Sequence, residues 1–364
     1  MSAGAPEQTD DPRGLTGASP DVLVVGLGPA GARAAAVAAA DGWRVLGVER
    51  RTTIGEPVQC AELVCSALTI EGFDWSGVTA QDVGRMVTRV EDHVPESTAG
   101  FAGRMISRRL FDQQLAARAA ACGAHLVHGV SVTRLAADGG VQLSSGETLR
   151  PRVIVGADGP RSQVGAAIGR VNRELVVALQ VAVRLKSTYD ATDIFLRAAY
   201  RGGYGWLFPK DREANLGIGV DYAMRSELKT LLAGLESELR AAGRIGAASR
   251  PSLTGGLIPV GGRLVACGRL RSVPVALAGD AAGLTNPVTG AGIEAAVRSG
   301  ELAGRAVSGW LAGQRLALED FEEELGDLYD GAYARAQRHR RETLRCASLS
   351  NLRRGWISSP EYWA

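Results

Sequence analysis

Three glycines near the start of the chain, Gly26, Gly28 and Gly31, have the spacing of a G-x-G-x-x-G motif. The motif follows the apolar run 22–25 and precedes an alanine-rich segment that is typical of a helix. Glycines at these places permit a tight turn, a close approach of the backbone to a pyrophosphate, and close packing of the helix on the strand. The free N–H groups at the start of such a helix stabilise phosphate charge. The pattern predicts a dinucleotide site.

The next predicted strand ends at Glu49, 21 residues after Gly28. A carboxylate at this place can accept hydrogen bonds from the two hydroxyls of a ribose. Arg50 comes directly after it and could suggest a phosphorylated ribose, but Glu49 would repel a 2′-phosphate. We therefore expect the dinucleotide to be NAD or FAD rather than NADP.

Two later segments, 153–165 and 274–300, favour FAD. In each, an apolar strand ends at an acidic residue, Asp158 in the first and Asp280 in the second. Asp280 could accept hydrogen bonds from a ribityl chain, and the glycine-rich loop before a helix that begins near Ile293 could stabilise negative charge on a flavin ring. Either segment alone could be an ordinary turn between a strand and a helix. Together with the first motif they indicate FAD, because a simple NAD enzyme needs no second, distant site.

The composition argues against several other classes of protein. The 364 residues include 41 basic and 39 acidic ones, and this balance does not favour nucleic-acid binding. The five cysteines are scattered and odd in number, so no disulfide framework is predicted. Neither they nor the four histidines form a cluster typical of a metal site. The apolar run 34–40 is too short to span a bilayer, and we expect a cytoplasmic protein, with peripheral membrane contact left open.

The three glycine-acid segments together resemble flavoproteins with the p-hydroxybenzoate hydroxylase-type fold. This resemblance implies an α/β protein, α+β overall, in which a glutathione-reductase-like Rossmann domain binds FAD and is interleaved with a β-sheet substrate domain. The segment 106–115 is also similar to this group and implies that Arg108 approaches the FAD phosphates. The alternative for Arg108 is a solvated residue at the start of a helix.

The resemblance implies four regions. They are a disordered leader (1–20), a discontinuous FAD-binding domain (21–85, 104–170 and 265–312), a substrate-binding β-sheet domain (86–103 and 171–264) and a C-terminal helical region (313–364).

An aromatic strand is predicted from Tyr204, where the sequence reads YGWLFPK. Side chains alternate between the two faces of a strand, so Tyr204, Trp206 and Phe208 share one face, and Pro209 closes the pattern. The rings could be buried against other parts of the protein or could line a site for a flat or elongated apolar ligand. The strand alone does not distinguish these alternatives.

The aromatic strand and the residues after it resemble the geranylgeranyl reductase family. Its Y-x-W-x-F-P pattern is followed by Gly217 and Gly219 in a G-x-G pair, and Pro57 and Cys60 match a P-x-x-C region of the same family. Known members reduce isoprenoid double bonds in archaeal lipids, chlorophyll side chains and menaquinone. The resemblance extends from residue 21 to about residue 310.

The resemblance implies a substrate-binding role for Tyr204, Trp206, Phe208 and Pro209, as the wall of an elongated apolar cavity beside the flavin. Reduced flavin would transfer a hydride to one alkene carbon while a proton reaches the other. Cys60 is the leading candidate for donating the proton or positioning the ring. The alternative is that Cys60 only packs, as a small buried apolar residue. Tyr204 and Trp206 complete the predicted catalytic set. The expected electron donor is NAD(P)H or a reduced carrier.

The predicted cofactor set has twenty members. They are Gly26, Gly28, Pro29, Ala30, Gly31, Glu49, Arg50, Cys60, Ala61, Arg108, Val132, Asp158, Gly159, Gly279, Asp280, Pro287, Gly290, Ala291, Gly292 and Ile293. The expected function is the reduction of carbon–carbon double bonds in a prenyl or related apolar substrate. The alternatives are a flavin monooxygenase acting on an aromatic metabolite, a cyclase or isomerase with non-redox FAD, and a flavoprotein that only carries electrons.

Overall fold

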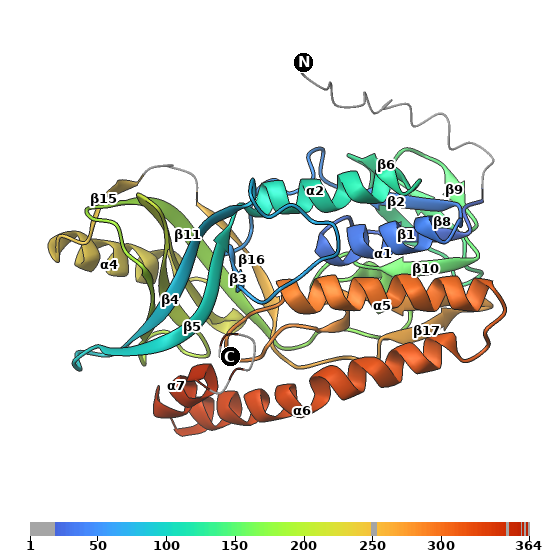
Figure 1. The fold of residues 1–364 in the computed structure, drawn as a ribbon. Helices are drawn as coiled ribbons and strands as arrows, with labels where there is room; N and C mark the ends of the chain where they lie inside the picture. The colour runs from blue at the N-terminus through green and yellow to red at the C-terminus, as the bar shows by residue number, and fades with distance from the viewer. Residues whose placement is uncertain (1–18, 249–252, 347–348, 358, 360–361, 363–364) are drawn as a thin grey trace, which may run out of the picture.

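The computed structural model describes residues 19–364 apart from 249–252, 347–348, 358, 360–361 and 363–364 (Figure 1). The predicted leader therefore lies, except for its last two residues, outside the described residues. Among the described residues no helix combines the length and the apolar character needed to cross a bilayer.

A six-stranded sheet carries the first glycine motif. Its strands in spatial order are β17 (Cys267–Leu270), β18 (Val273–Leu277), β10 (Val153–Gly156), β1 (Val22–Val25), β2 (Val45–Glu49) and β6 (His125–His128). All neighbours are parallel except the β17–β18 pair. The carboxyl ends of β1, β2 and β10 therefore meet at one edge, which is where ligands bind in open α/β sheets.

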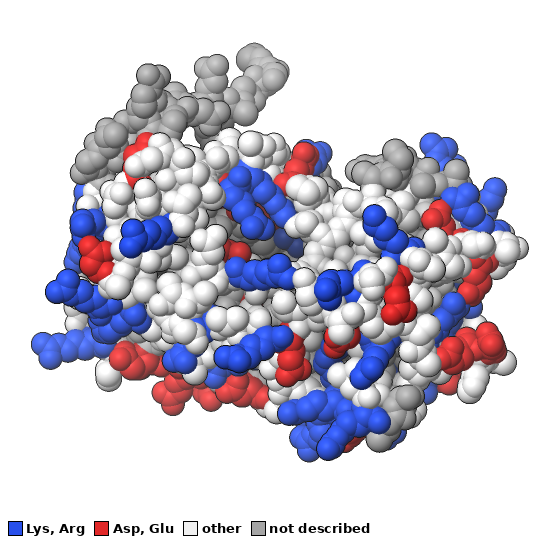
Figure 2. Space-filling model, turned by 180° about the vertical axis from the view of Figure 1, so that it is seen from behind, with Lys and Arg blue, Asp and Glu red and all other residues white. Residues whose placement is uncertain are grey.

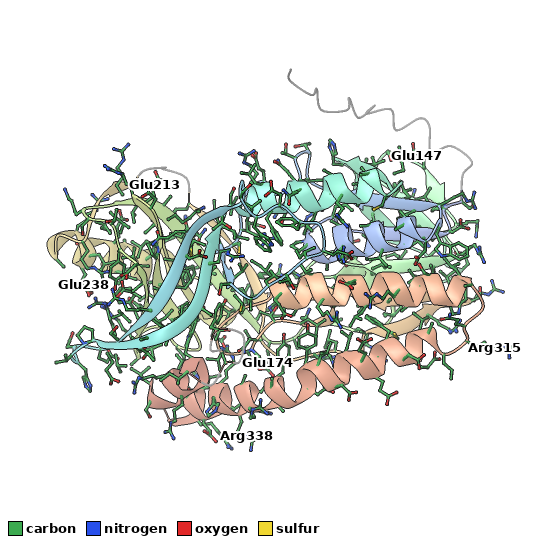
Figure 3. All side chains as sticks on the ribbon, viewed as in Figure 1. Glu147, Glu174, Glu213, Glu238, Arg315 and Arg338 are labelled. Carbon is green, nitrogen blue, oxygen red and sulfur yellow. The ribbon has the colours of Figure 1, made fainter. Side chains whose placement is uncertain are left out.

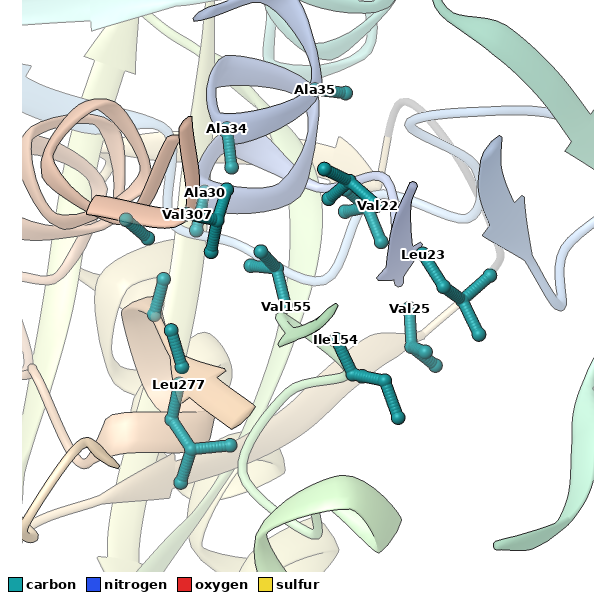
Figure 4. Close-up of a cluster of buried hydrophobic side chains, with 14 of the residues drawn as sticks. Val22, Leu23, Val25, Ala30, Ala34, Ala35, Ile154, Val155, Leu277 and Val307 are labelled. Carbon is teal, nitrogen blue, oxygen red and sulfur yellow. The ribbon is translucent and has the colours of Figure 1, made fainter. Parts of the chain in front are cut away.

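Helices and a small sheet surround this six-stranded sheet. They are α1 (Pro29–Ala40), α2 (Arg108–Ala121), α3 (Gln163–Ala167), η3 (Gly279–Ala282), α5 (Ile293–Leu311) and the strands β7 (Val132–Leu135), β8 (Val141–Leu143) and β9 (Thr148–Leu149). Helix α1 packs between α2 and α5 (Figure 1). The alanines of α1 allow this close approach, and they meet apolar residues of β1 and β10 in the core shown in Figure 4.

A nine-stranded sheet forms the second part of the molecule. Its main path is β15 (Ile245–Ala248), β11 (Leu175–Leu185), β14 (Glu213–Asp221), β13 (Tyr204–Lys210), β12 (Ala191–Leu196), β4 (Thr79–Val90), β5 (Glu96–Ile106) and β3 (Leu63–Cys65), and β16 (Thr254–Pro259) pairs with β11. The short η2 (Tyr222–Met224) leads to α4 (Leu228–Ala241), whose leucines pack on one face of this sheet.

The second sheet begins earlier in the chain than predicted. The predicted boundary at residue 86 falls inside β4, and β3 also pairs into the nine-stranded sheet although it was expected in the FAD-binding domain. Strands β4 and β5 form one long hairpin, and its backbone pairing, which shifts register twice between Thr79 and Arg85, keeps 79–85 in the same sheet as 86–90.

The C-terminal helices connect the two parts. Helix α6 (Ala317–Cys346) packs against α5 and β17 and leads to α7 (Leu349–Ile357), which reaches β12 (Figure 1). Helix α6 is acidic in its first turn and basic in its last, which complements the helix dipole. In Figure 2 acidic side chains gather along the lower left edge of the molecule, and a cluster of basic ones lies at its lowest part.

Candidate flavin and substrate site

One cavity of about 640 Å3 is lined by residues of both sheets. Charged side chains such as Glu238, Arg315 and Arg338 lie instead at the periphery of the molecule (Figure 3). Every predicted site residue lines the cavity except Gly31, Pro209 and Pro287. The structure thus brings together segments that are more than 250 residues apart in the sequence.

The three glycines of the first motif have different surroundings. A Cβ on Gly26 would lie 2.4 Å from the carbonyl oxygen of Ala157, and one on Gly31 would lie 1.8 Å from that of Gly26. A Cβ on Gly28 would meet nothing within 4 Å. Gly26 and Gly31 are therefore needed for packing, whereas Gly28 borders open space at the start of α1.

The start of α1 fits a pyrophosphate. Gly28 is its N-cap, Pro29 follows, no side chain caps the helix, and its first turn has no acidic residue. The positive end of the helix thus faces the cavity without a counter-charge of its own. Glu49, at the end of β2, is oriented by the backbone N–H groups of Leu27 and Arg51, which donate to it over 2.9 and 3.0 Å.

The two later acids have different roles. Asp158 accepts hydrogen bonds from Ser162 Oγ (2.5 Å) and from the N–H groups of Gln163 (2.7 Å) and Val164 (3.2 Å), so it mainly orders the start of α3. Among the described residues, the Asp280 carboxyl accepts one side-chain hydrogen bond, from Thr285 Oγ1 at 3.2 Å. Burial raises the pKa of Asp280 above its ordinary value. A buried carboxyl with spare acceptor capacity fits the hydroxyls of a ribityl chain.

The loop before α5 forms another side of the cavity. Asn286 Oδ1 accepts from the N–H groups of Val288 (2.9 Å) and Thr289 (3.2 Å), which holds the loop in a turn. Gly290 has a positive φ of 70°, and Gly292 caps α5 without a side-chain hydrogen bond. Pro287 is buried within this loop and does not reach the cavity. Gly290 and Gly292 border the cavity without side chains, and this fits the flat ring of a flavin.

The segment that carries Cys60 is held from two strands of the nine-stranded sheet. Gln180 Nε2 donates to the carbonyl of Cys60 over 2.7 Å, and Asn215 Nδ2 donates to that of Ala61 over 3.0 Å. The Cys60 sulfur accepts from the N–H of Glu62 at 3.2 Å. Burial raises the pKa of the Cys60 thiol, against the opposing effect of Arg108, so the thiol keeps its proton at neutral pH.

Glu62 and Arg108 form a buried charged network beside Cys60. Glu62 accepts from the N–H of Arg108 (2.9 Å), from Lys210 Nζ (2.6 Å) and from Asn215 Nδ2 (2.9 Å). The guanidinium of Arg108 makes a bidentate pair with Asp112 over 2.9 and 3.0 Å. Burial alone lowers the pKa of Arg108, but Asp112 and Cys60 raise it more strongly. Arg108 lines the cavity and is not a solvated residue, while Glu62 and Asp112 were not predicted.

The aromatic face of β13 is both buried and part of the cavity wall. Trp206 is 5% exposed and Phe208 is 2% exposed. The hydroxyl of Tyr204 donates to the carbonyl of Thr289 and so connects the strand to the loop before α5. Burial raises the pKa of Tyr204. Both alternatives for these rings hold, because the same face packs and borders the cavity.

Pro209 does not share this face. It pairs with Ala214 and occupies the alternate position of the strand, on the side that packs towards α4. We therefore correct the aromatic wall to Tyr204, Trp206 and Phe208.

The C-terminal region contributes two further rings that were not predicted. Trp356 of α7 meets Tyr204 edge-on with ring centroids 5.1 Å apart, and it stacks with Tyr362 at 6.2 Å. Both residues line the cavity. Helix α7 approaches closely because Gly355 packs against Val288. The only signal in the sequence is the presence of large aromatic residues at the end of the chain.

Comparisons with known proteins agree with this geometry. A family model described as "Lycopene cyclase protein" matches residues 21–361. Digeranylgeranylglycerophospholipid reductase 2 of Methanopyrus kandleri is 32% identical over 306 residues, which cover 78% of this chain and 76% of the relative. The digeranylgeranylglycerophospholipid reductase of Methanocella arvoryzae is 32% identical over 346 residues, with 86% and 85% covered.

A solved structure shares the whole fold. The geranylgeranyl bacteriochlorophyll reductase-like protein of Thermoplasma acidophilum superimposes with a TM-score of 0.80 and 26% identity, and the match covers 94% of this chain and 92% of that one. The predicted fold is confirmed. The chain belongs to the family described by the matching model, and its similarity to the named reductases shows that it is a member of the geranylgeranyl reductase family of FAD-dependent flavoproteins.

Proposed function

We propose that this protein is an FAD-dependent oxidoreductase that reduces carbon–carbon double bonds of an isoprenoid chain. One observation carries the proposal: a single cavity joins the start of α1, Asp280 and the loop before α5 to the aromatic wall of β13. The names of the curated relatives, which are reductases of geranylgeranyl lipids, support the same substrate class.

Residues of the six-stranded sheet would hold FAD. The N–H groups at the start of α1 would bind the pyrophosphate, Glu49 the ribose and Asp280 the ribityl hydroxyls, with Gly290 and Gly292 against the ring. When bound and reduced, FAD supplies the hydride for the reaction. The expected source of electrons is NAD(P)H or a reduced carrier, and a comparison of flavin reduction by each would identify it.

The aromatic wall would bind the isoprenoid chain and exclude water from it. Burial of apolar surface contributes roughly 25 cal/mol per Å2, so several isoprene units bind without a hydrogen bond. The rings of Tyr204 and Trp206, with centroids 5.9 Å apart, would orient the chain beside the flavin loop. An alkene has no carbonyl to stabilise charge, so a dry and closely fitting pocket is important for the reaction.

Cys60 is the better candidate for the proton source. Its thiol is protonated because burial raises its pKa, and the sulfur accepts the hydrogen bond from the N–H of Glu62, which leaves the S–H available as a donor. The proton of Tyr204 is already donated to the carbonyl of Thr289. We therefore assign proton donation to Cys60 and orientation of the substrate to Tyr204.

The test is incubation of the purified holoenzyme with a prenyl substrate and an electron donor, in parallel under argon and under air. We expect the product to gain two hydrogen atoms per reduced double bond under both gases. Gain of an oxygen atom only in air would indicate a monooxygenase, and a product of unchanged mass would indicate a cyclase or isomerase. Flavin turnover with a carrier and no product would indicate an electron carrier.

The long apolar substrate also motivates the prediction of peripheral membrane contact. Co-sedimentation with vesicles that contain the prenyl substrate would measure it, and equal recovery with substrate-free vesicles and without vesicles would contradict it. The predicted cytoplasmic location stays a prediction.

A further inference from the structure

Two polar atoms in the aromatic part of the cavity have no hydrogen-bond partner among the described residues. They are Oε1 of Gln180, an acceptor, and Nε1 of Trp206, a donor. The two side chains line the cavity and are only 7% and 5% exposed. Buried polar groups are nearly always paired, so this pair indicates a ligand group that completes them.

The strand register places the two side chains on one line across the sheet. Gly217 of β14 is the partner of Gln180 on β11 and of Trp206 on β13. A Cβ on Gly217 would lie 2.2 Å from the indole of Trp206 and 2.8 Å from Cβ of Gln180. The missing side chain of Gly217 therefore lets the two residues reach the same place above the sheet.

The orientation of the Gln180 amide follows from its other contact. Its Nε2 donates to the carbonyl of Cys60 over 2.7 Å, and a flipped amide would place two acceptors against each other there. The oxygen is therefore the atom of the Gln180 amide that is left without a partner, close to the segment that carries Cys60. A donor and an acceptor without partners thus belong to side chains that flank Gly217 at the cavity wall, beside the segment that carries the proposed proton source.

A hydrocarbon chain can satisfy neither atom. A phosphate can accept from Trp206, but its negative charge would face the oxygen of Gln180. A hydroxyl group both donates and accepts, and it is neutral and small enough for a dry site. We propose that Gln180 and Trp206 bind a hydroxyl group of the substrate, so that the substrate class is an isoprenoid alcohol. This inference rests on the proposed function for the isoprenoid part of the substrate.

The test is a binding titration of the oxidised holoenzyme, in which changes in the flavin absorbance spectrum report binding. The ligands are geranylgeraniol, its methyl ether, its phosphate ester and the hydrocarbon that lacks the oxygen atom. The alcohol can use both groups, whereas the ether can accept from Trp206 but has no proton for Gln180. We expect the alcohol to bind about tenfold or more tightly than the ether, and the ether more tightly than the hydrocarbon.

Two variants separate the two contacts. Trp206→Phe removes the indole N–H and part of the apolar wall, so it should weaken binding of the alcohol and the ether by more than it weakens binding of the hydrocarbon. Gln180→Met removes the acceptor together with the hydrogen bond to the Cys60 carbonyl. Within this variant the alcohol and the ether should therefore bind with equal affinity. Phe208→Leu is the matched control, because it alters a ring on the same face of the same strand without removing a polar atom, and it should affect all ligands alike.

Equal affinity of the wild-type protein for alcohol, ether and hydrocarbon would overturn the inference. So would tighter binding of the phosphate ester, or a Trp206→Phe variant that changes FAD affinity but leaves the preference for the alcohol intact. Failure of the proposed function can be distinguished from failure of this inference. An alcohol that binds selectively but is never reduced contradicts only the proposed alkene reduction. Equal binding of all ligands with reduction of each contradicts only the hydroxyl site.

Discussion

Gly217 lies directly opposite Trp206 on neighbouring antiparallel strands, and a Cβ on Gly217 would lie 2.2 Å from the indole ring. The G-x-G pair that follows the aromatic strand thus has a physical explanation. The indole occupies the space that a side chain at this position of β14 would fill. The glycine sets the position of the ring and therefore the shape of the cavity.

Gly217→Ala should displace the indole. Because the contact is with the body of a buried ring, we expect a loss of about 1–3 kcal/mol in the free energy of unfolding and a larger loss in affinity for a prenyl substrate. FAD affinity should change little, since Gly217 does not line the cofactor end. Urea denaturation and ligand titration measure the two effects. Gly234→Ala, at an exposed position of α4 with nothing within 4 Å, is the control and should be stabilising. Unchanged substrate affinity in Gly217→Ala would contradict the explanation.

Gly28→Ala and Gly31→Ala should separate cofactor binding from folding. A Cβ on Gly28 meets nothing within 4 Å, and the residue has φ −68°, so the FAD-free protein should keep its thermal stability. Its FAD affinity should fall at least about tenfold, because the methyl group occupies the approach to the pyrophosphate. Gly31→Ala should instead lower the thermal stability, since its Cβ meets the carbonyl of Gly26. Normal FAD affinity of Gly28→Ala, measured by fluorescence quenching, would show that the pyrophosphate binds elsewhere.

Asp280 predicts a pH dependence of the FAD-free protein. Burial raises its pKa in the folded state above the ordinary 3.8. As the pH rises above 3.8, the carboxyl loses its proton in the unfolded chain before it does so in the folded protein. The folded state then binds more protons than the unfolded state, so the free energy of unfolding falls as the pH rises towards the folded-state pKa. Asp280→Asn should remove this part of the slope and weaken FAD binding about tenfold. Urea denaturation at a series of pH values measures it, with the exposed Asp92→Asn as control. Identical slopes for Asp280→Asn and wild type would refute the prediction.

Cys60→Ala should slow the reduction of the alkene about a hundredfold or more, if the thiol supplies the proton, while FAD stays bound. The raised pKa keeps the thiol protonated, so the wild-type rate should stay level through the ordinary thiol value of 9.0 and fall only at higher pH. Single-turnover kinetics under argon measure both effects. Cys65→Ala is the control, because Cys65 is half-buried and does not line the cavity. A Cys60→Ala variant with the wild-type rate would leave Cys60 only a packing role.

The cofactor end of the site could be predicted from the sequence because its requirements are local. Backbone geometry within one turn requires the glycines at 26, 28 and 31, and the acid at Glu49 ends the next strand. The position of Pro209 could also have been derived, since strict alternation already places it on the face opposite Trp206.

The other site residues depend on pairing between distant strands and could not be predicted in this way. Gln180 reaches the carbonyl of Cys60 across 120 residues of sequence, through the register of β11, β14 and β13. Trp356 reaches Tyr204 only because α6 carries α7 across to the nine-stranded sheet. Neither residue belongs to a local pattern that distinguishes a cavity wall from an ordinary core.

The most direct test of the account is a single turnover under argon. The holoenzyme is reduced chemically, excess reductant is removed, and a prenyl substrate is added while flavin absorbance is followed. We predict that the oxidised flavin spectrum returns without oxygen and that one double bond gains two hydrogens for each flavin reoxidised. A flavin that stays reduced until air is admitted would contradict the assignment of this cavity to alkene reduction.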